Sequence, residues 1–105
     1  MATITPISAG GNTAVTYAAA SAGGDVVATG TSSRTVFLVR NAGSSITVTL
    51  TAVNACSQGV LHNVVITCPA GDTEILIPPN CETTTGNCSV TYSSVTSVTI
   101  AAINN

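Results

Sequence analysis

The chain has 105 residues, a formal net charge of −2 and only six charged side chains, none of them lysine. This length predicts one domain, residues 1–105, built around a single core. So little charge excludes charge-driven disorder, a groove for nucleic acid and a basic helix on a membrane surface, because each of these needs many more charged residues.

Alternating apolar and polar residues predict β-strands along the whole chain. In chain order, the expected strands are 2–8, 13–18, 25–29, 35–39, 45–52, 61–68, 73–78, 88–93 and 95–102. Residues 1–8 are left open as an N-terminal arm, which would add a strand to a neighbouring molecule. We expect an all-β protein: a single antiparallel β-sandwich of about eight strands, immunoglobulin-like or jelly-roll, with no substantial helix.

The clearest of these strands is 45–52, where apolar residues alternate with threonine and serine. Residues 35–39 are apolar on both faces and lie between Arg34 and Arg40, which indicates a central strand covered on both sides. The residues between these strands, Asn-Ala-Gly-Ser at 41–44, are typical of a short hairpin loop. The expected core contains Val36, Leu38, Ile46, Val48, Leu50, Val64, Ile66, Val98 and Ile100.

The four cysteines, Cys56, Cys68, Cys81 and Cys88, are candidates for disulfides. Four cysteines permit three pairings. We expect the local pairs, Cys56 with Cys68 and Cys81 with Cys88, which would stabilise the fold by roughly 2 to 3 kcal/mol each; buried free thiols are the structural alternative. A zinc site that also uses His62 is disfavoured, because the chain has no second histidine and no Cys-x2-Cys spacing.

Few other residues are candidates for chemistry. His62 is the sole candidate base and lacks a recognisable nucleophile motif, so we expect a surface or interface histidine. Asp72 and Glu74 are too few carboxylates for a calcium loop. Asn87 begins a glycosylation pattern that matters only in a secreted eukaryotic chain. We therefore expect no enzyme, with no catalytic, cofactor-binding or metal-binding residues and no cofactor.

The N-terminal residues have neither a cationic start nor an apolar run, and no stretch approaches the roughly 18 apolar residues of a membrane span. We therefore expect a protein that is made in the cytosol and does not enter a membrane. Soluble monomers commonly protect their sheet edges with lysine. Because this chain has none, we expect another protein to cover an edge or a face of the sandwich.

Four stretches carry a family resemblance: 17–25 (YAAASAGGD), 34–50 (RTVFLVRNAGSSITVTL), 56–69 (CSQGVLHNVVITCP) and 86–103 (GNCSVTYSSVTSVTIAAI). Together they resemble a family of small all-β virion proteins of tailed bacteriophages. The chain departs from that pattern at 75–79, where a Gly-Pro step is usual, and in having Cys81 and Cys88. The resemblance implies a head decoration or minor capsid protein and implies no catalytic residues.

We accordingly expect a decoration (cement) protein, made in the host cytoplasm, that bridges copies of the major capsid protein on the outer surface of a phage head. The outer surface is favoured because two cationic side chains are too few to bind packaged DNA. A homo-oligomer is expected, as a trimer, from the threefold positions of such heads. A tail or neck accessory protein is the alternative. A host-surface or carbohydrate-binding module is disfavoured, because only Tyr17, Phe37 and Tyr92 could stack on sugars.

Overall fold

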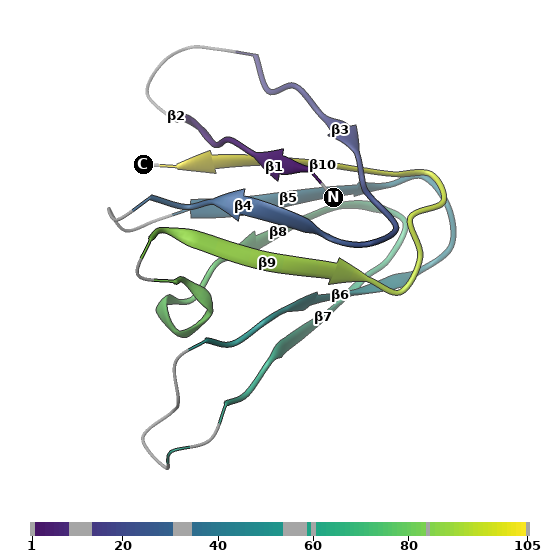
Figure 1. Cartoon of the computed structure of the whole chain (residues 1–105). Coiled ribbons are helices and arrows are strands. Elements are labelled where there is room, and N and C mark those ends of the chain that lie inside the picture. The colour runs from purple at the N-terminus through teal and green to yellow at the C-terminus, as the bar shows by residue number, and fades with distance from the viewer. Residues whose placement is uncertain are drawn as a thin grey trace.

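The computed structural model describes residues 2–8, 14–30, 35–53, 59, 61–83 and 85–104 (Figure 1). In these ranges the chain forms ten strands and one short 3-10 turn: β1 (Thr3–Ile4), β2 (Ile7–Ser8), β3 (Ala18–Ala19), β4 (Asp25–Ala28), β5 (Thr35–Asn41), β6 (Ile46–Leu50), β7 (Val64–Cys68), β8 (Gly71–Leu76), η1 (Pro79–Cys81), β9 (Asn87–Tyr92) and β10 (Val98–Asn104). None of the described segments is a helix long and apolar enough to cross a membrane. The all-β prediction is confirmed.

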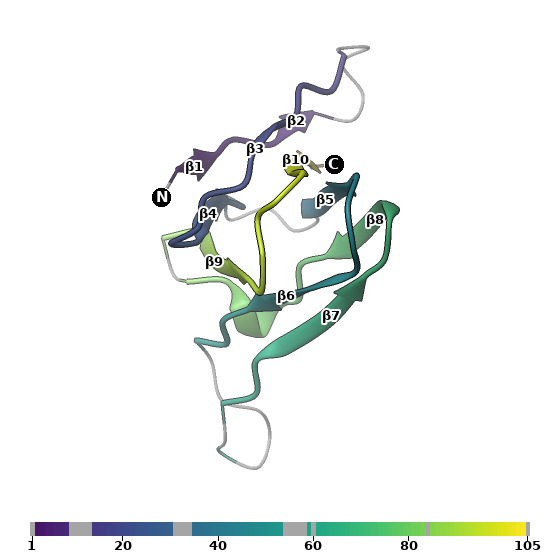
Figure 2. The same cartoon turned by 90° about the vertical axis from the view of Figure 1, so that its right-hand side faces the viewer.

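The strands form two sheets that face each other (Figure 2). Sheet A has the order β1-β4-β9-β6-β7, and sheet B has the order β2-β10-β5-β8, with β3 also paired to β10. All pairings are antiparallel except β1 with β4 and β2 with β10, which are parallel. The side chains between the two sheets form one core, as in a β-sandwich.

The antiparallel pairs are nested within one another. The strands β6 and β7 pair at the centre of this series, followed outward by β5 with β8, β4 with β9, and β3 with β10. The chain therefore resembles one long hairpin whose successive pairs belong to alternate sheets, which is the connectivity of an eight-stranded jelly roll. An immunoglobulin-like order, ABED on CFG, pairs consecutive strands in both sheets, whereas among the described strands only β6 and β7 are both consecutive and paired.

The connection between β5 and β6 is a corner, and the hairpin predicted from residues 41–44 is wrong. The chain passes here from sheet B to sheet A. Asn41, only 1% exposed, stabilises the corner. Its side-chain nitrogen donates hydrogen bonds to the carbonyl oxygens of Ser44 and Cys68 at 2.7 and 3.1 Å, and its side-chain oxygen accepts one from the Gly43 amide at 3.0 Å. The residue types correctly indicated a turn, but they do not encode where the next strand pairs.

Seven of the nine predicted core residues contribute to the core. Two of them, Val64 and Ile66, are partly buried and pack against the core. The other five are fully inside it: Ile46, Val48, Leu50, Val98 and Ile100. The predicted face of β5 is wrong. Phe37 and Val39 point into the core, while Val36 and Leu38 lie half-buried on the other face. Because both faces of this strand are apolar, alternation alone could not choose between them.

Residues 2–8 pair with this chain's own sheets. Thr3 lies opposite Val26 at the edge of sheet A, and Ile7 lies opposite Ile103 in sheet B. The segment therefore crosses from one sheet to the other along one side of the sandwich (Figure 2). In the structure it is a pair of short strands and not the free arm that the sequence left open; Met1 lies outside the described residues.

Candidate functional site

A buried carboxylate lies at the start of β4. Asp25 follows the turn that ends at Gly24 and is 1% exposed. Gly24 has a φ of 95°, and a Cβ atom at this position would lie 2.7 Å from the carbonyl oxygen of Val90. Glycine is therefore required for β4 to approach β9 this closely, and this approach brings Asp25 toward Tyr92.

Asp25 accepts hydrogen bonds from three separate parts of the chain. Its Oδ1 atom accepts from the Ala2 amide at 2.9 Å, and its Oδ2 atom accepts from the Ser21 amide at 3.1 Å and the Tyr92 hydroxyl at 2.8 Å. Burial raises the pKa of Asp25, but the hydrogen bonds from Ser21, Tyr92 and Ala2 outweigh this effect and lower its pKa below the ordinary value. Burial and the adjacent carboxylate raise the pKa of Tyr92. Both oxygens are thus engaged in holding the fold together.

The cysteines that the structure describes are buried free thiols. Cys68, Cys81 and Cys88 are completely buried, and the predicted Cys81–Cys88 disulfide is not formed; Cys56, and with it the predicted pair with Cys68, lies outside the described residues. The Sγ atom of Cys81 lies 3.8 Å from the carbonyl oxygen of Leu50 on β6, and the Sγ atom of Cys88 lies 3.9 Å from the carbonyl oxygen of Ser89, the next residue of β9. These side chains pack as small apolar groups, so the alternative of buried thiols replaces the local pairing.

Burial also makes these thiols poor nucleophiles. It raises the pKa of Cys88 to about 12, with smaller contributions from Cys81 and Glu82. It raises the pKa of Cys68 and of Cys81 as well. A thiolate is the reactive form of cysteine. These three residues therefore remain protonated at neutral pH in the folded protein.

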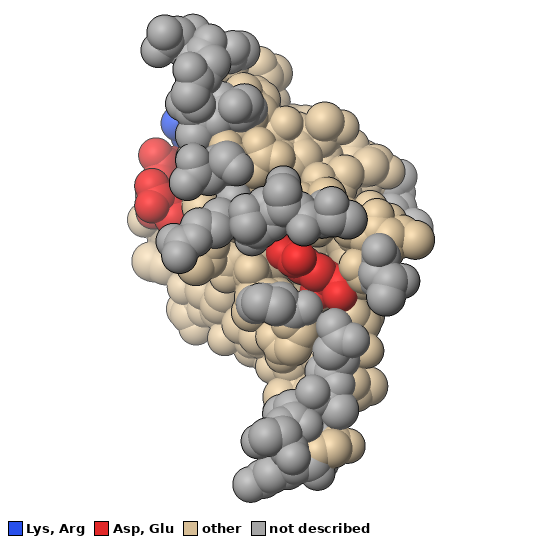
Figure 3. Space-filling view, turned by 90° about the vertical axis from the view of Figure 1, so that its left-hand side faces the viewer, with Lys and Arg blue, Asp and Glu red and all other residues tan. Residues whose placement is uncertain are grey.

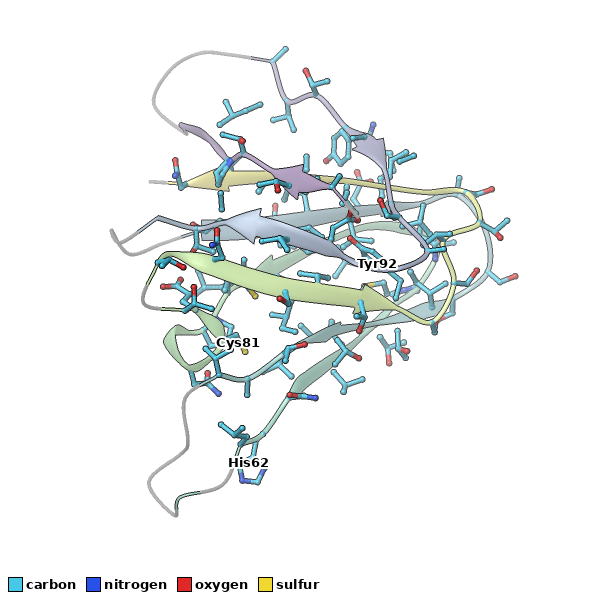
Figure 4. All side chains as sticks on the ribbon, in the orientation of Figure 1. His62, Cys81 and Tyr92 are labelled. Atoms are coloured by element: carbon cyan, nitrogen blue, oxygen red, sulfur yellow. The ribbon has the colours of Figure 1, made fainter. Side chains whose placement is uncertain are left out.

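The other candidate residues are scattered over the surface. His62 is exposed and projects from the end of the β6–β7 hairpin, well apart from Cys81 and Tyr92 (Figure 4). Asp72 and Glu74 lie on β8 and not in a loop, and Asp72 accepts a hydrogen bond from the guanidinium of Arg40 at 3.1 Å. The described residues contain no group of three or more His, Cys, Asp or Glu side chains that could hold a metal ion. Arg34 lies outside the described residues.

Asp25 and Asn41 are structural centres that no sequence pattern predicted. Both residues stand next to glycine-containing turns, which was the only local signal. Their partners are distant in the chain: Tyr92 is 67 residues from Asp25, and Cys68 is 27 residues from Asn41. A local pattern cannot reveal contacts at these separations.

The outer face of sheet A is the most distinctive surface. Thr49 lies at its centre, opposite Val65 on one side and Thr91 on the other. Side chains alternate along each strand, so the residues that share this face in β4, β6, β7 and β9 are Val26, Ala28, Thr47, Thr49, Val65, Thr67, Asn87, Ser89 and Thr91. None of them is charged. We call these nine residues the sheet-A face.

Charge is sparse elsewhere too. On the side of the molecule shown in Figure 3, acidic side chains form two separate groups, and most of the described surface between and around them is uncharged. The Arg40–Asp72 ion pair belongs to sheet B, because β5 and β8 are its strands. The sheet-A face therefore has the depletion of charge that is typical of the centre of a protein interface.

Comparisons with known proteins found no match: no protein-family model, no curated protein and no solved structure matches this chain.

Proposed function

We propose that this chain is a structural protein of a tailed-bacteriophage virion, a decoration protein that binds the outer surface of the head and bridges copies of the major capsid protein. The observation that supports this function is the uncharged sheet-A face of the sandwich. The motif order at 17–25, 34–50, 56–69 and 86–103 supports the assignment to a virion.

The chemistry of the sheet-A face suits a permanent protein contact. Each threonine offers a methyl group and a hydroxyl group, so it can pack and form a hydrogen bond at the same place. Covering such a surface does not require the removal of water from a charged group, which is the most expensive kind of desolvation. A protein that contacts two capsid subunits at once also gains from the high effective concentration of the second contact.

The outer surface of the head is the proposed location because the inner surface faces DNA. Binding to DNA depends on lysine and arginine. The chain has two arginines and a net charge of −2. We propose that it acts as a homo-oligomer, made in the host cytoplasm and assembled onto the head.

The test compares two variants that add the same charge at different places. Thr49→Lys adds a cation to the centre of the sheet-A face, and Ala42→Lys adds one to the exposed corner between β5 and β6. We expect the first variant to lose binding to purified heads and the second to bind like the wild type, as measured by co-sedimentation. Equal binding by both variants would contradict the role of this face.

The location is tested on particles. We expect cryo-electron microscopy to show density for the chain on the outside of the head, and we expect particles without the protein to lose their DNA at a lower temperature. Density on the tail or neck, or equal heat stability of the two kinds of particle, would overturn the proposal.

A further inference from the structure

The side of the sandwich opposite the N-terminal segment ends in two edge strands, β7 of sheet A and β8 of sheet B. In the described part of the chain, β7 pairs only with β6, and β8 pairs only with β5. Each of these strands therefore has one row of backbone N–H and C=O groups directed away from its own sheet. Such a row can pair with a strand of another molecule unless side chains prevent it.

The hydrogen bonds of β6 identify the open groups of β7. The carbonyl oxygen of Thr47 accepts a hydrogen bond from the Ser93 amide, on the side of β9. The N–H and C=O groups of successive residues point to opposite sides of a strand. Those of the odd-numbered residues of β6 therefore face β9, and those of the even-numbered residues face β7. Their partners on β7 are Val64, Ile66 and Cys68. The N–H and C=O groups left open along the strand are those of Val65 and Thr67.

The open backbone groups of β8 follow from its hydrogen bonds to β5. The Ile77 amide donates a hydrogen bond to the Thr35 carbonyl oxygen, so the odd-numbered residues of this strand face β5. The open backbone groups belong to Asp72, Glu74 and Leu76. Two of these three residues are exposed carboxylates, which is a common way to keep a sheet edge from pairing.

The edge of β7 has no such protection. Residues 61–68 contain no Asp, Glu, Lys, Arg or Pro. Val65, one of the two residues of β7 with open backbone groups, is 62% exposed, and Leu61 nearby is 57% exposed. The two edges therefore differ: β8 carries the exposed carboxylates of Glu74 and of Asp72, which is paired with Arg40, and β7 offers open backbone groups around an exposed apolar side chain.

We propose that β7 pairs antiparallel with β7 of a second copy of this chain, around a twofold axis at Val65. In this register Val65 lies opposite its own copy, and Asn63 of each molecule lies opposite Thr67 of the other. A register displaced by two residues in one direction would place Asn63 opposite Pro69, which has no N–H group to donate, and in the other direction it would place polar Asn63 opposite apolar Val65. The register centred on Val65 places this apolar residue opposite its own copy and places the polar residues Asn63 and Thr67 opposite each other. The edge of β7 is therefore complementary to itself.

Charge favours a second copy as the partner. Two β7 strands bring no like charges together, whereas two β8 strands would place Asp72 and Glu74 close to their own copies. Pairing joins two five-stranded sheets A into one continuous sheet of ten strands. The two sheet-A faces then lie side by side as one larger uncharged surface. The contact follows from the edge itself and holds whether or not the partner surface is a phage capsid.

The contact predicts a dimer, whereas the trimer expected from the sequence would need a different contact. The free full-length protein is therefore studied by sedimentation and by light scattering over a range of concentrations. We expect the mass of a dimer for the wild type, of a monomer for Val65→Lys, and of a dimer for Leu76→Lys, which adds the same charge to an exposed apolar residue of β8. A wild-type monomer or trimer, or a Val65→Lys variant that keeps the wild-type mass, would overturn the proposal.

A cross-link tests the register without adding charge. In a hydrogen-bonded antiparallel pair the Cα atoms are about 5.5 Å apart, which a disulfide can span. We expect Val65→Cys to form a covalent dimer under mild oxidation, with peptide mapping that places the bond between the two introduced thiols. Leu76→Cys is the control and should remain uncross-linked. Equal cross-linking of both variants would contradict the twofold axis at Val65. Because neither experiment involves phage particles, their failure is distinguishable from failure of the proposed function.

Discussion

Tyr92 donates its hydroxyl hydrogen to the carboxylate of Asp25 across 2.8 Å, although the two residues are 67 positions apart in the chain. The same carboxylate accepts a hydrogen bond from the Ala2 amide, and the Val26 amide donates to the Ala2 carbonyl oxygen at 2.9 Å. One buried group thus connects the N-terminal segment, the start of β4 and the end of β9.

Removal of the Tyr92 hydroxyl should weaken this connection. We expect Tyr92→Phe to lower the free energy of unfolding by about 1 to 3 kcal/mol, because a hydrogen bond to a buried charged group is lost. Urea denaturation measures the change. Tyr17→Phe is the matched control, since the guanidinium of Arg40 lies over the ring of Tyr17, 4.1 Å from its centroid, and phenylalanine keeps that ring. Equal losses in the two variants would show that the Asp25 contact contributes nothing specific.

Acid should release the same connection. The pKa of Asp25 is lowered in the folded protein, so its contribution to stability is present above its ordinary pKa of 3.8 and is lost as pH falls through the lower folded value. We expect the free energy of unfolding of the wild type to fall below about pH 4. Asp25→Asn should be less stable at pH 7 and should approach the wild type in acid, as measured by urea denaturation at each pH. Curves that stay parallel would contradict this account.

The buried thiols should be inaccessible in the folded protein. We expect Cys68, Cys81 and Cys88 to react with a thiol-specific dye only after unfolding, because each is completely buried and its pKa is raised. Mass spectrometry of labelled peptides identifies which cysteines have reacted. An unreduced peptide that contains a bond between Cys81 and Cys88 would contradict the free-thiol structure.

Leu50 provides a test of the core. It is completely buried, so we expect Leu50→Ala to lower the free energy of unfolding by about 2 to 5 kcal/mol through lost burial and a residual cavity. Leu76→Ala makes the same chemical change at a residue that is 58% exposed, and it should change the stability by less than about 0.5 kcal/mol. Thermal and urea denaturation of both variants measure the difference, and similar losses at the two sites would contradict the assigned core.

Local residue patterns were enough to predict most of the strands and, for some of them, the buried face. In β6, apolar residues alternate with threonine, and successive side chains of a strand point to opposite faces, so Ile46, Val48 and Leu50 had to share one side. The short strand β3 was predicted only in part, since the predicted strand 13–18 overlaps it only at Ala18. Its two residues, Ala18 and Ala19, pair with β10 but are too few to show an alternating pattern.

Three features depend on how the two sheets pack: which face of β5 is buried, whether residues 41–44 turn back or cross between sheets, and which distant groups meet at Asp25. In β5 both faces are apolar, so the choice of Phe37 over Leu38 depends on the sheet packed against it. The jelly-roll order was likewise open, because pairing is set by contacts between segments far apart in the chain. Such contacts exist only once the two sheets pack together, and no residue carries a local signal for a partner that folding has yet to bring beside it.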